Sequence, residues 1–248
     1  VYFSTVTDHW STMTISGPNA RKVLEKICDI DVSNDSFKYM DWRAATVAGV
    51  KARIFRISFT GELSFEINVQ ANYGMHAWKA VMAAGEEFNI TPYGTETMHI
   101  LRAEKGFIIV GQDTDGSVTP QDLDMDWVVG KKKEFSFIGK RSFTRQDTAR
   151  ADRKQFVGLK PKDANVVLPE GAQAVRNPNE SIPMTMVGHV TSSYYSAVLG
   201  HSFALAVIKD GQNRKGESVY FPLADGRTIE AEITDYVFYD GKGEKQHV

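Results

Sequence analysis

The stretch that decides the fold prediction is Ser58-Phe59-Thr60-Gly61-Glu62-Leu63-Ser64-Phe65-Glu66-Ile67. Polar and apolar side chains alternate over residues 51–59 before it, and the alternation resumes over residues 63–69. A period of two is typical of half-buried strands, and glycine permits the backbone conformation that a sharp reversal needs. The pattern therefore predicts a β-hairpin with a tight turn at Thr60-Gly61.

Glu66 lies in the middle of the second expected strand, between apolar neighbours. Successive side chains of a strand point to opposite faces, so Glu66 shares its face with Ser64 and Asn68, while Phe65 and Ile67 share the other. Two interpretations stay open from the pattern. Glu66 is either an exposed strand carboxylate, or a partly buried acceptor for a flat ring edge with N–H and NH2 donors, such as that of a pterin or a guanine.

The elements around this hairpin mix strands and helices. A turn at Ser16-Gly17-Pro18 starts a helix with Val23, Leu24 and Ile27 on its apolar face. A later helix ends at Gly106, a residue type that commonly closes helices. An α+β layer is the fold that suits this order. The further expected elements are strands at 2–7, 11–15, 51–59 and 63–69, and helices at 74–88, with His76, Trp78, Val81 and Met82 near its inner surface, and at 95–105.

The second half of the chain has a different character. Residues 142–153 are polar and lack apolar periodicity, which indicates a linker. Beyond them, short apolar runs alternate with Gly, Pro, Asn and Asp, which is typical of a small antiparallel barrel or sandwich. We expect an α+β domain over residues 1–145 and a β-barrel domain over residues 146–248. The expected strands are 156–159, 186–191, 203–208, 218–221 and 229–238.

Composition excludes several classes of function. The formal net charge is -2 and no basic stripe is present, so neither nucleic acid nor an anionic membrane is an expected partner. No apolar run approaches the about 20 residues of a membrane helix. Cys28 is the single cysteine, so no internal disulfide can form; this suits a reducing compartment, and we expect the cytoplasm. The six histidines show no metal-ligand spacing, so no metal site is expected.

Three further stretches carry recognisable patterns: residues 91–106, which include Leu101-Arg102-Ala103-Glu104-Lys105-Gly106; residues 188–195; and residues 237–240. In this order the hairpin, the Leu-Arg-Ala-Glu-Lys-Gly helix end and Gly188-His189-Val190-Thr191-Ser192-Ser193 resemble the glycine cleavage T-protein (aminomethyltransferase) superfamily. The resemblance extends from about Val1 to about Asp240. It implies a folate-binding α/β layer followed by a C-terminal barrel.

Within the superfamily, residues 90–96, 102–116 and 188–194 resemble the alpha subunits of heterotetrameric sarcosine oxidases. This implies the C-terminal, tetrahydrofolate-binding part of such a subunit, which supports oxidative demethylation of sarcosine to glycine with capture of the one-carbon unit as 5,10-methylenetetrahydrofolate. The implied partners are the other subunits of the heterotetramer and folate. FAD, FMN and NAD are expected in the full complex, but not on this chain.

The resemblance also assigns site residues. The glutamate that matches Glu66 holds the pterin ring, Thr60 and Gly61 form the turn beside it, and Tyr239 matches a tyrosine that lines the folate cavity. The family's catalytic aspartate is expected upstream of Val1, so the chain is expected to be a fragment that is inactive on its own.

The chain departs from the T-protein pattern at two positions. Phe59 replaces a tyrosine, and Met98 replaces an arginine that contacts folate, so contacts with the polar tail must differ. His99 is adjacent to Met98, but an ordinary helix histidine is the simpler interpretation.

Two alternatives stay open. One is a stand-alone folate-dependent aminomethyltransferase. The other is a non-catalytic folate-binding or assembly module. Members that assist iron–sulfur assembly carry a Lys-Gly-Cys-Tyr type motif, where this chain has Lys105-Gly106-Phe107-Ile108 without a thiol.

Overall fold

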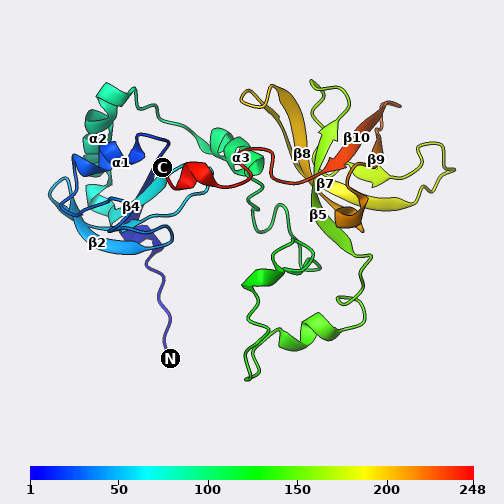
Figure 1. Cartoon of the computed structure of the whole chain (residues 1–248), viewed down its shortest axis with the longest axis horizontal. Coiled ribbons are helices and arrows are strands. Elements are labelled where there is room, and N and C mark those ends of the chain that lie inside the picture. The colour runs from blue at the N-terminus through cyan, green and yellow to red at the C-terminus, as the bar shows by residue number, and fades with distance from the viewer. The chain divides into compact units, whose positions relative to one another are not determined.

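The computed structural model describes all residues, 1–248, and divides into two compact units (Figure 1). The first unit comprises Val1–Arg102 with Asp240–Val248, and the second comprises Ala103–Tyr239. The last turn of one helix, α3 (Thr95–Glu104), contains the division between them. The domain boundary expected between residues 145 and 146 falls inside the second unit and stays a prediction.

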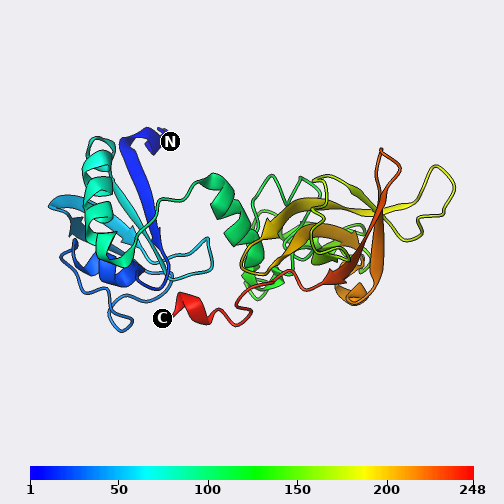
Figure 2. The same cartoon turned by 90° about the horizontal axis from the view of Figure 1, so that it is seen from above.

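The first unit is built on a four-stranded antiparallel sheet in the order β1-β4-β3-β2. Helices α1 and α2 cover one face of it, as Figure 2 shows. The expected mixture of helix and sheet is therefore confirmed. The elements of this unit are β1 (Trp10–Ser16), α1 (Ala20–Glu25), β2 (Trp42–Val47), β3 (Val50–Phe55), β4 (Ser64–Gln70) and α2 (Gly74–Gly85).

Strand alternation builds the core of this unit. Phe65, Ile67 and Val69 of β4 are fully buried, and they belong to one apolar cluster with residues of both helices, including Leu24 of α1 and Ala77 of α2. Burying a large apolar side chain stabilises the folded state by about 1.5–3 kcal/mol. Every second residue of β4 therefore faces the helices, and the residues between them face the other way, as the sequence pattern predicts.

Several local expectations are wrong. The hairpin turn is not tight: β3 ends at Phe55, and eight irregular residues, 56–63, precede β4. The reason is that the chain leaves the sheet at Arg56, whose backbone N–H and C=O bond to the 40–41 turn instead of β4. Residues 2–7 form no strand, because no neighbouring strand pairs with them, and β2 was not anticipated.

The inner face of α2 also differs from the expectation. Gly74, Ala77 and Val81 face the core, whereas His76 and Trp78 are exposed. The small residues face inward because the helix packs closely on the sheet: a Cβ added at Gly74 would lie 2.4 Å from the Ser11 hydroxyl. Because the helix and the sheet approach closely, only small side chains fit between them, and the larger side chains of α2 lie on its outer face.

The second unit contains a closed six-stranded antiparallel barrel in the order β10-β5-β8-β7-β6-β9. Its interior is apolar and includes Val157, Leu159, Ala206, Phe221 and Ile233, all at 0% exposure. The expected small C-terminal barrel is confirmed, although β10 ends earlier than expected and β6 was missed. The strands are β5 (Lys154–Pro161), β6 (Gln173–Val175), β7 (Met186–Ser196), β8 (His201–Lys209), β9 (Ser218–Pro222) and β10 (Thr228–Thr234).

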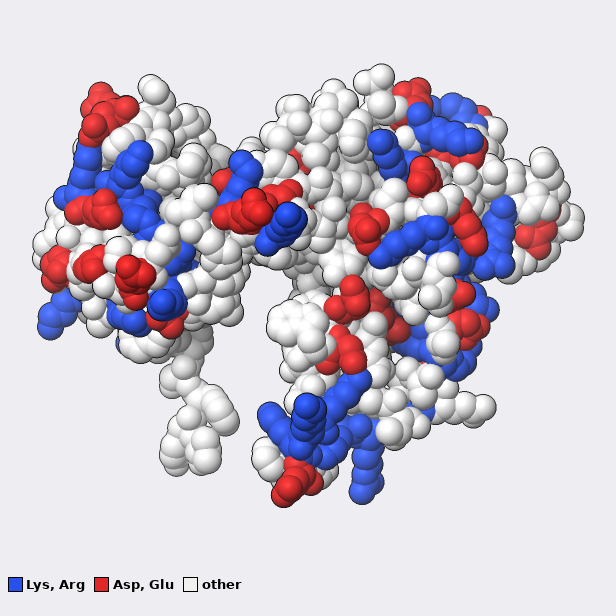
Figure 3. Space-filling view, viewed as in Figure 1, with Lys and Arg blue, Asp and Glu red and all other residues white.

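An irregular segment, residues 106–153, precedes the barrel and contains only two short 3-10 helices, Asp126–Val128 and Lys140–Thr144. It is fastened to the barrel by the Phe156 N–H of β5, which donates to the Asp122 carbonyl oxygen at 2.7 Å. Within the segment, the Arg153 guanidinium bonds both carboxylate oxygens of Asp122 at 2.9 Å. On the face drawn in Figure 3, basic and acidic side chains are mixed over the barrel strands. No helix is long and apolar enough to cross a membrane.

The remaining 3-10 helices are short and connect larger elements. They are Thr7–His9, Ala71–Tyr73, Glu86–Phe88, Gly211–Arg214 and Glu244–Gln246.

Candidate functional site

The sheet face opposite α1 and α2 carries Glu66 at its centre. Glu66 is paired in register with Thr14 of β1 on one side and with Phe55 of β3 on the other. Asn68, two residues along β4, lies on the same face and accepts a hydrogen bond of 2.5 Å from Thr12. This face is therefore the polar one, and Glu66 is its single carboxylate on β4.

The Glu66 side chain is half-buried, and burial raises the pKa of its carboxyl group above the ordinary value. It forms no hydrogen bond or ion pair within the chain, unlike its neighbours Ser64 and Asn68. A partly desolvated carboxylate without a partner is energetically costly, and two donors from a ligand would offset that cost. Of the two interpretations, this environment favours a partly buried acceptor over a solvated strand carboxylate.

Thr60 and Gly61 lie in the 56–63 loop that leads into β4. Thr60 is 3% exposed, and its hydroxyl accepts from the Glu62 N–H at 3.5 Å. Gly61 has φ +85°, and its N–H donates to the Ser58 hydroxyl at 3.0 Å. A residue with a Cβ is strained at this φ, so glycine is needed for the loop to return to the sheet. These two residues and Glu66 belong to the same unit and the same chain reversal.

Arg56 at the start of this loop was missed by the sequence analysis. It is 2% exposed, and its guanidinium donates to the carbonyl oxygens of Phe37 at 2.6 Å and Gln246 at 3.3 Å. Burial lowers the pKa of Arg56, and its Nε has no hydrogen-bond partner. Nothing in the sequence around Arg56 indicates that it is buried or that it binds these two carbonyl oxygens. It anchors the loop to the C-terminal segment of the same unit.

Tyr239 is the last residue of the second unit. It is half-buried, and its backbone N–H donates to the Glu104 carbonyl oxygen at 2.9 Å, as does that of Phe238. Glu104 is 2% exposed, and its carboxylate accepts from the Ser196 hydroxyl at 2.6 Å. The helix-end residue Glu104 is therefore engaged in holding the second unit together.

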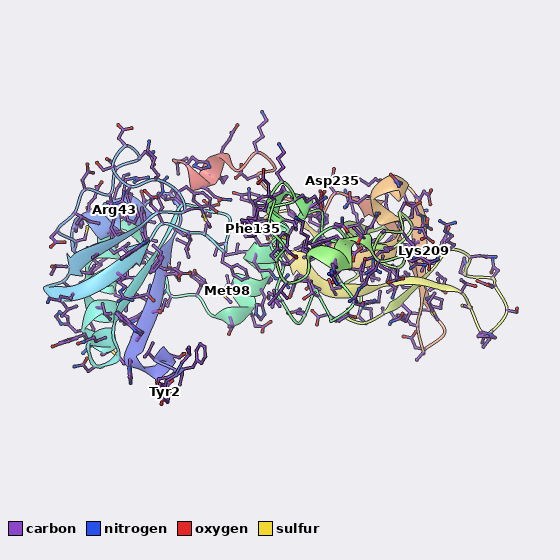
Figure 4. All side chains as sticks on the ribbon, turned by 90° about the horizontal axis from the view of Figure 1, so that it is seen from below. Tyr2, Arg43, Met98, Phe135, Lys209 and Asp235 are labelled. Atoms are coloured by element: carbon purple, nitrogen blue, oxygen red, sulfur yellow. The ribbon has the colours of Figure 1, made fainter.

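A cavity of the first unit lies beside β1 and encloses about 810 Å³. It is lined by β1, α1, α2 and residues 88–98, and it includes Met98, which Figure 4 labels on α3. Thr60, Gly61 and Glu66 do not line it. Its lining contains no arginine or lysine, so the polar tail of a folate would find no cation there. Thr12 and Thr14, the strand partners of Asn68 and Glu66, are among the lining residues.

The Gly188–Tyr194 stretch has a structural function in the barrel. The hydroxyls of Thr191 and Ser192 on β7 donate to Asp113 Oδ1 at 2.6 and 2.8 Å, and the Ile109 N–H donates to Asp113 Oδ2 at 2.8 Å. Asp113 is 1% exposed. These bonds tie the irregular segment to the barrel wall. No group of His, Cys, Asp and Glu side chains in the chain is arranged to hold a metal ion.

Two family models match this chain. One, described as the GCVT N-terminal domain, matches residues 1–133, and the other, described as the glycine cleavage T-protein C-terminal barrel domain, matches residues 154–240. The chain belongs to the glycine cleavage T-protein family. Within this family arrangement, Glu66, Thr60 and Gly61 fall in the GCVT N-terminal domain, and Tyr239 falls in the barrel domain.

Curated members of related families are much longer than the chain. It is 50% identical over 248 residues to the sarcosine oxidase subunit alpha of Corynebacterium sp. (strain U-96), which covers 98% of the chain and 25% of that relative. It is 32% identical over 225 residues to the mitochondrial dimethylglycine dehydrogenase of Homo sapiens, which covers 90% of the chain and 25% of that relative. The chain therefore spans about a quarter of the length of these two relatives.

Among solved structures, the chain is similar to the glycine cleavage system aminomethyltransferase T from Bartonella henselae. The TM-score is 0.67 at 17% sequence identity, with 94% of this chain and 85% of that chain covered. At this identity the likeness shows the fold alone. The T-protein-like fold expected from the sequence motifs is confirmed.

Proposed function

We propose that the chain is the tetrahydrofolate-binding part of a sarcosine-oxidase-type alpha subunit. The observation that carries the proposal is the half-buried Glu66 carboxylate, which has no partner within the chain. Its support from comparison is the 50% identity over 98% of the chain to a sarcosine oxidase subunit alpha. Thr60 and Gly61, in the same unit as Glu66, are part of the proposed site. Tyr239, in the second unit, is proposed as a folate-binding residue from the family resemblance alone.

Glu66 suits a pterin for a chemical reason. The pyrimidine part of a reduced pterin presents a ring N–H and an exocyclic NH2 side by side on one flat edge. A carboxylate is acceptor-only when ionised and can receive both donors at once. Each hydrogen bond to a charged group contributes about 1.5–3 kcal/mol net, so the pair orients the ring as well as binding it.

In the proposed reaction, a flavin elsewhere in the complex would oxidise sarcosine to an imine. One of the two folate nitrogens N5 and N10 would add to the imine carbon, and the other would then displace glycine, so that two N–C bonds form as the bond to the glycine nitrogen breaks. The contribution of this chain is to hold and orient the ring. A bound ring beside the arriving imine makes the capture effectively unimolecular. The product is 5,10-methylenetetrahydrofolate.

The remaining parts of the proposal concern the whole protein. The partners are the other subunits of a heterotetramer, and FAD, FMN and NAD belong to parts outside residues 1–248. The cytoplasm is the proposed location. A relative named dimethylglycine dehydrogenase is 32% identical, so other N-methylated glycines belong to the same proposed substrate class.

Titration calorimetry with folinate tests the proposal. We expect saturable binding of one folinate per chain and a rise in the thermal unfolding midpoint, because a ligand that binds only the folded state stabilises it. p-Aminobenzoylglutamate, which lacks the pterin ring, is the matched control and should bind much more weakly. If folinate binds neither the chain nor a longer protein that contains it, the proposal is wrong.

A further inference from the structure

Two aromatic rings stack on the open face of the first unit's sheet. The rings of Trp42 on β2 and Phe55 on β3 have centroids 6.1 Å apart and planes inclined by 25°. Trp42 is 54% exposed, although large aromatic side chains are usually buried. Neither ring belongs to the apolar core cluster between the sheet and the helices. The pair is therefore an aromatic surface that the fold of the unit leaves partly uncovered, with Trp42 exposed and Phe55 half-buried.

The strand register places this stack next to Glu66. Trp42 is the partner of Phe55, and Phe55 is the partner of Glu66, so the three residues form one row across β2, β3 and β4. The two rings stack in the direction that crosses the strands. A third ring added to the stack beyond Phe55 would lie above Glu66. Neighbouring strands are about 4.8 Å apart, which is close to the spacing of offset-stacked rings. A flat ring on the free side of Phe55 would therefore stand with its lower edge over the carboxylate.

On the β1 side of Glu66, no large side chain stands beside the carboxylate. Thr14 of β1 is the partner of Glu66 there, and it is exposed with a short side chain. By contrast, the second aromatic residue of this region, Trp10, is covered by Arg53, whose guanidinium carbon lies 4.6 Å from the ring centroid. No cation covers Phe55 or Trp42 in this way. Phe55 and the carboxylate without a partner thus lie side by side on one face of the sheet.

We infer that Phe55, backed by Trp42, is a stacking platform for the flat pyrimidine part of the ligand whose donor edge rests on Glu66. The inference rests on the proposed function and concerns the ligand specificity of the same site. The ligand is a 2-amino-4-oxo heterocycle whose edge bonds Glu66 and whose face stacks on Phe55. A ligand that has the two donors but no flat ring would make only the hydrogen bonds to Glu66. A ligand that has a flat ring but no adjacent donors would make only the stacking contact with Phe55.

A purely structural role for the pair predicts something different. Cross-strand aromatic pairs stabilise sheets, so Phe55→Leu would then lower the unfolding midpoint and leave ligand affinity unchanged in the folded protein. The platform predicts a loss of affinity in protein that remains folded. Measuring affinity and unfolding midpoint on the same preparations separates the two.

The test is calorimetric titration of the 248-residue chain and its variants with folinate and with 6-methyltetrahydropterin, which keeps the ring and lacks the tail. We expect Phe55→Leu to weaken both ligands by about three- to tenfold, the size of a lost aromatic stack. Trp42→Leu, one layer further away, should weaken them less. Trp10→Leu, whose ring Arg53 already covers, should bind as the wild type does.

The outcomes distinguish the platform from the proposed function. If Glu66→Gln weakens folinate while Phe55→Leu matches the wild type, the platform is wrong and the folate site stands. If the wild-type chain and a longer protein containing it bind neither ligand, both are wrong. Loss of affinity for both ligands in folded Phe55→Leu, with Trp10→Leu unchanged, supports the platform.

Discussion

Phe55 and Glu66 are direct partners in the register of β3 and β4. Both side chains are half-buried, and both lie on the sheet face away from α1 and α2. An aromatic ring and a carboxylate without a partner are thereby brought into one place, although eleven positions of chain separate them. This pairing is the physical basis of the proposed ligand site, and it makes the contribution of each residue measurable.

Replacement of Glu66 by alanine should weaken folinate binding by roughly ten- to a hundredfold, because one charged hydrogen bond or more is lost. The fold should persist, since the apolar face of β4 is unchanged. Titration calorimetry measures the affinity. Glu232→Ala is the matched control, because Glu232 is an exposed strand carboxylate on β10. Equal affinities of Glu66→Ala and the wild type would remove Glu66 from the site.

The pH dependence of stability should also change in a Glu66→Gln variant. Burial raises the pKa of Glu66, so the folded state binds its proton more tightly than the unfolded state does. Ionised Glu66 therefore destabilises the fold above its raised pKa, and this effect disappears below the ordinary carboxyl pKa of about 4.3. We expect the variant to be more stable than the wild type at pH 7, by less than about 1 kcal/mol because the group is partly solvated.

Denaturant unfolding at pH 7 and near pH 4 checks this sign. The stability gain of Glu66→Gln should shrink as the pH falls through the window between the raised and the ordinary pKa. A variant that is less stable than the wild type at pH 7 would contradict the assignment of Glu66 as a carboxylate without a partner.

Asp113 should be essential for the stability of the second unit. Asp113→Ala removes the acceptor of the Ser192 hydroxyl and of the Ile109 N–H at a position that is 1% exposed, whereas the Thr191 hydroxyl keeps the Leu205 carbonyl oxygen at 3.2 Å. We expect a loss of about 3 kcal/mol or more, because each unsatisfied buried group costs about 1–3 kcal/mol. Circular dichroism during urea unfolding measures it. Asp115→Ala is the control, since exposed Asp115 bonds only within its own turn, to Ser117 and Val118. A similar loss there would argue against the buried network.

Gly188 is required by a close approach between β7 and β8. A Cβ at this position would lie 2.2 Å from the Val207 carbonyl oxygen, which is backbone and cannot move aside freely. Gly188→Ala should therefore destabilise the barrel by about 1–3 kcal/mol, the usual cost of overpacking. Gly116→Ala, which has nothing within 4 Å of the added Cβ, should unfold with the wild-type midpoint. A thermal scan of both variants suffices, and a tolerant Gly188 would mean that β7 and β8 can separate.

Local patterns were sufficient for much of the fold. The alternation around Phe65 and Ile67 placed Glu66 on the correct face, because strand side chains alternate whatever the tertiary context. Gly106 correctly marked the end of a helix: it has φ +74°, and a Cβ there would lie 2.6 Å from Tyr236. Turn residues and apolar runs likewise predicted the barrel. Such signals depend on neighbours in the chain, which a sequence displays directly.

Long-range pairings were beyond the reach of those patterns. The partnership of Trp42, Phe55 and Glu66, the burial of Arg56 against Phe37 and Gln246, and the bonds from Thr191 and Ser192 to Asp113 all join residues from separate segments. Local periodicity specifies which face of a strand is apolar, but it does not specify which strand lies beside it. That choice depends on how the apolar faces pack together, and the chemistry of the site depends on that choice.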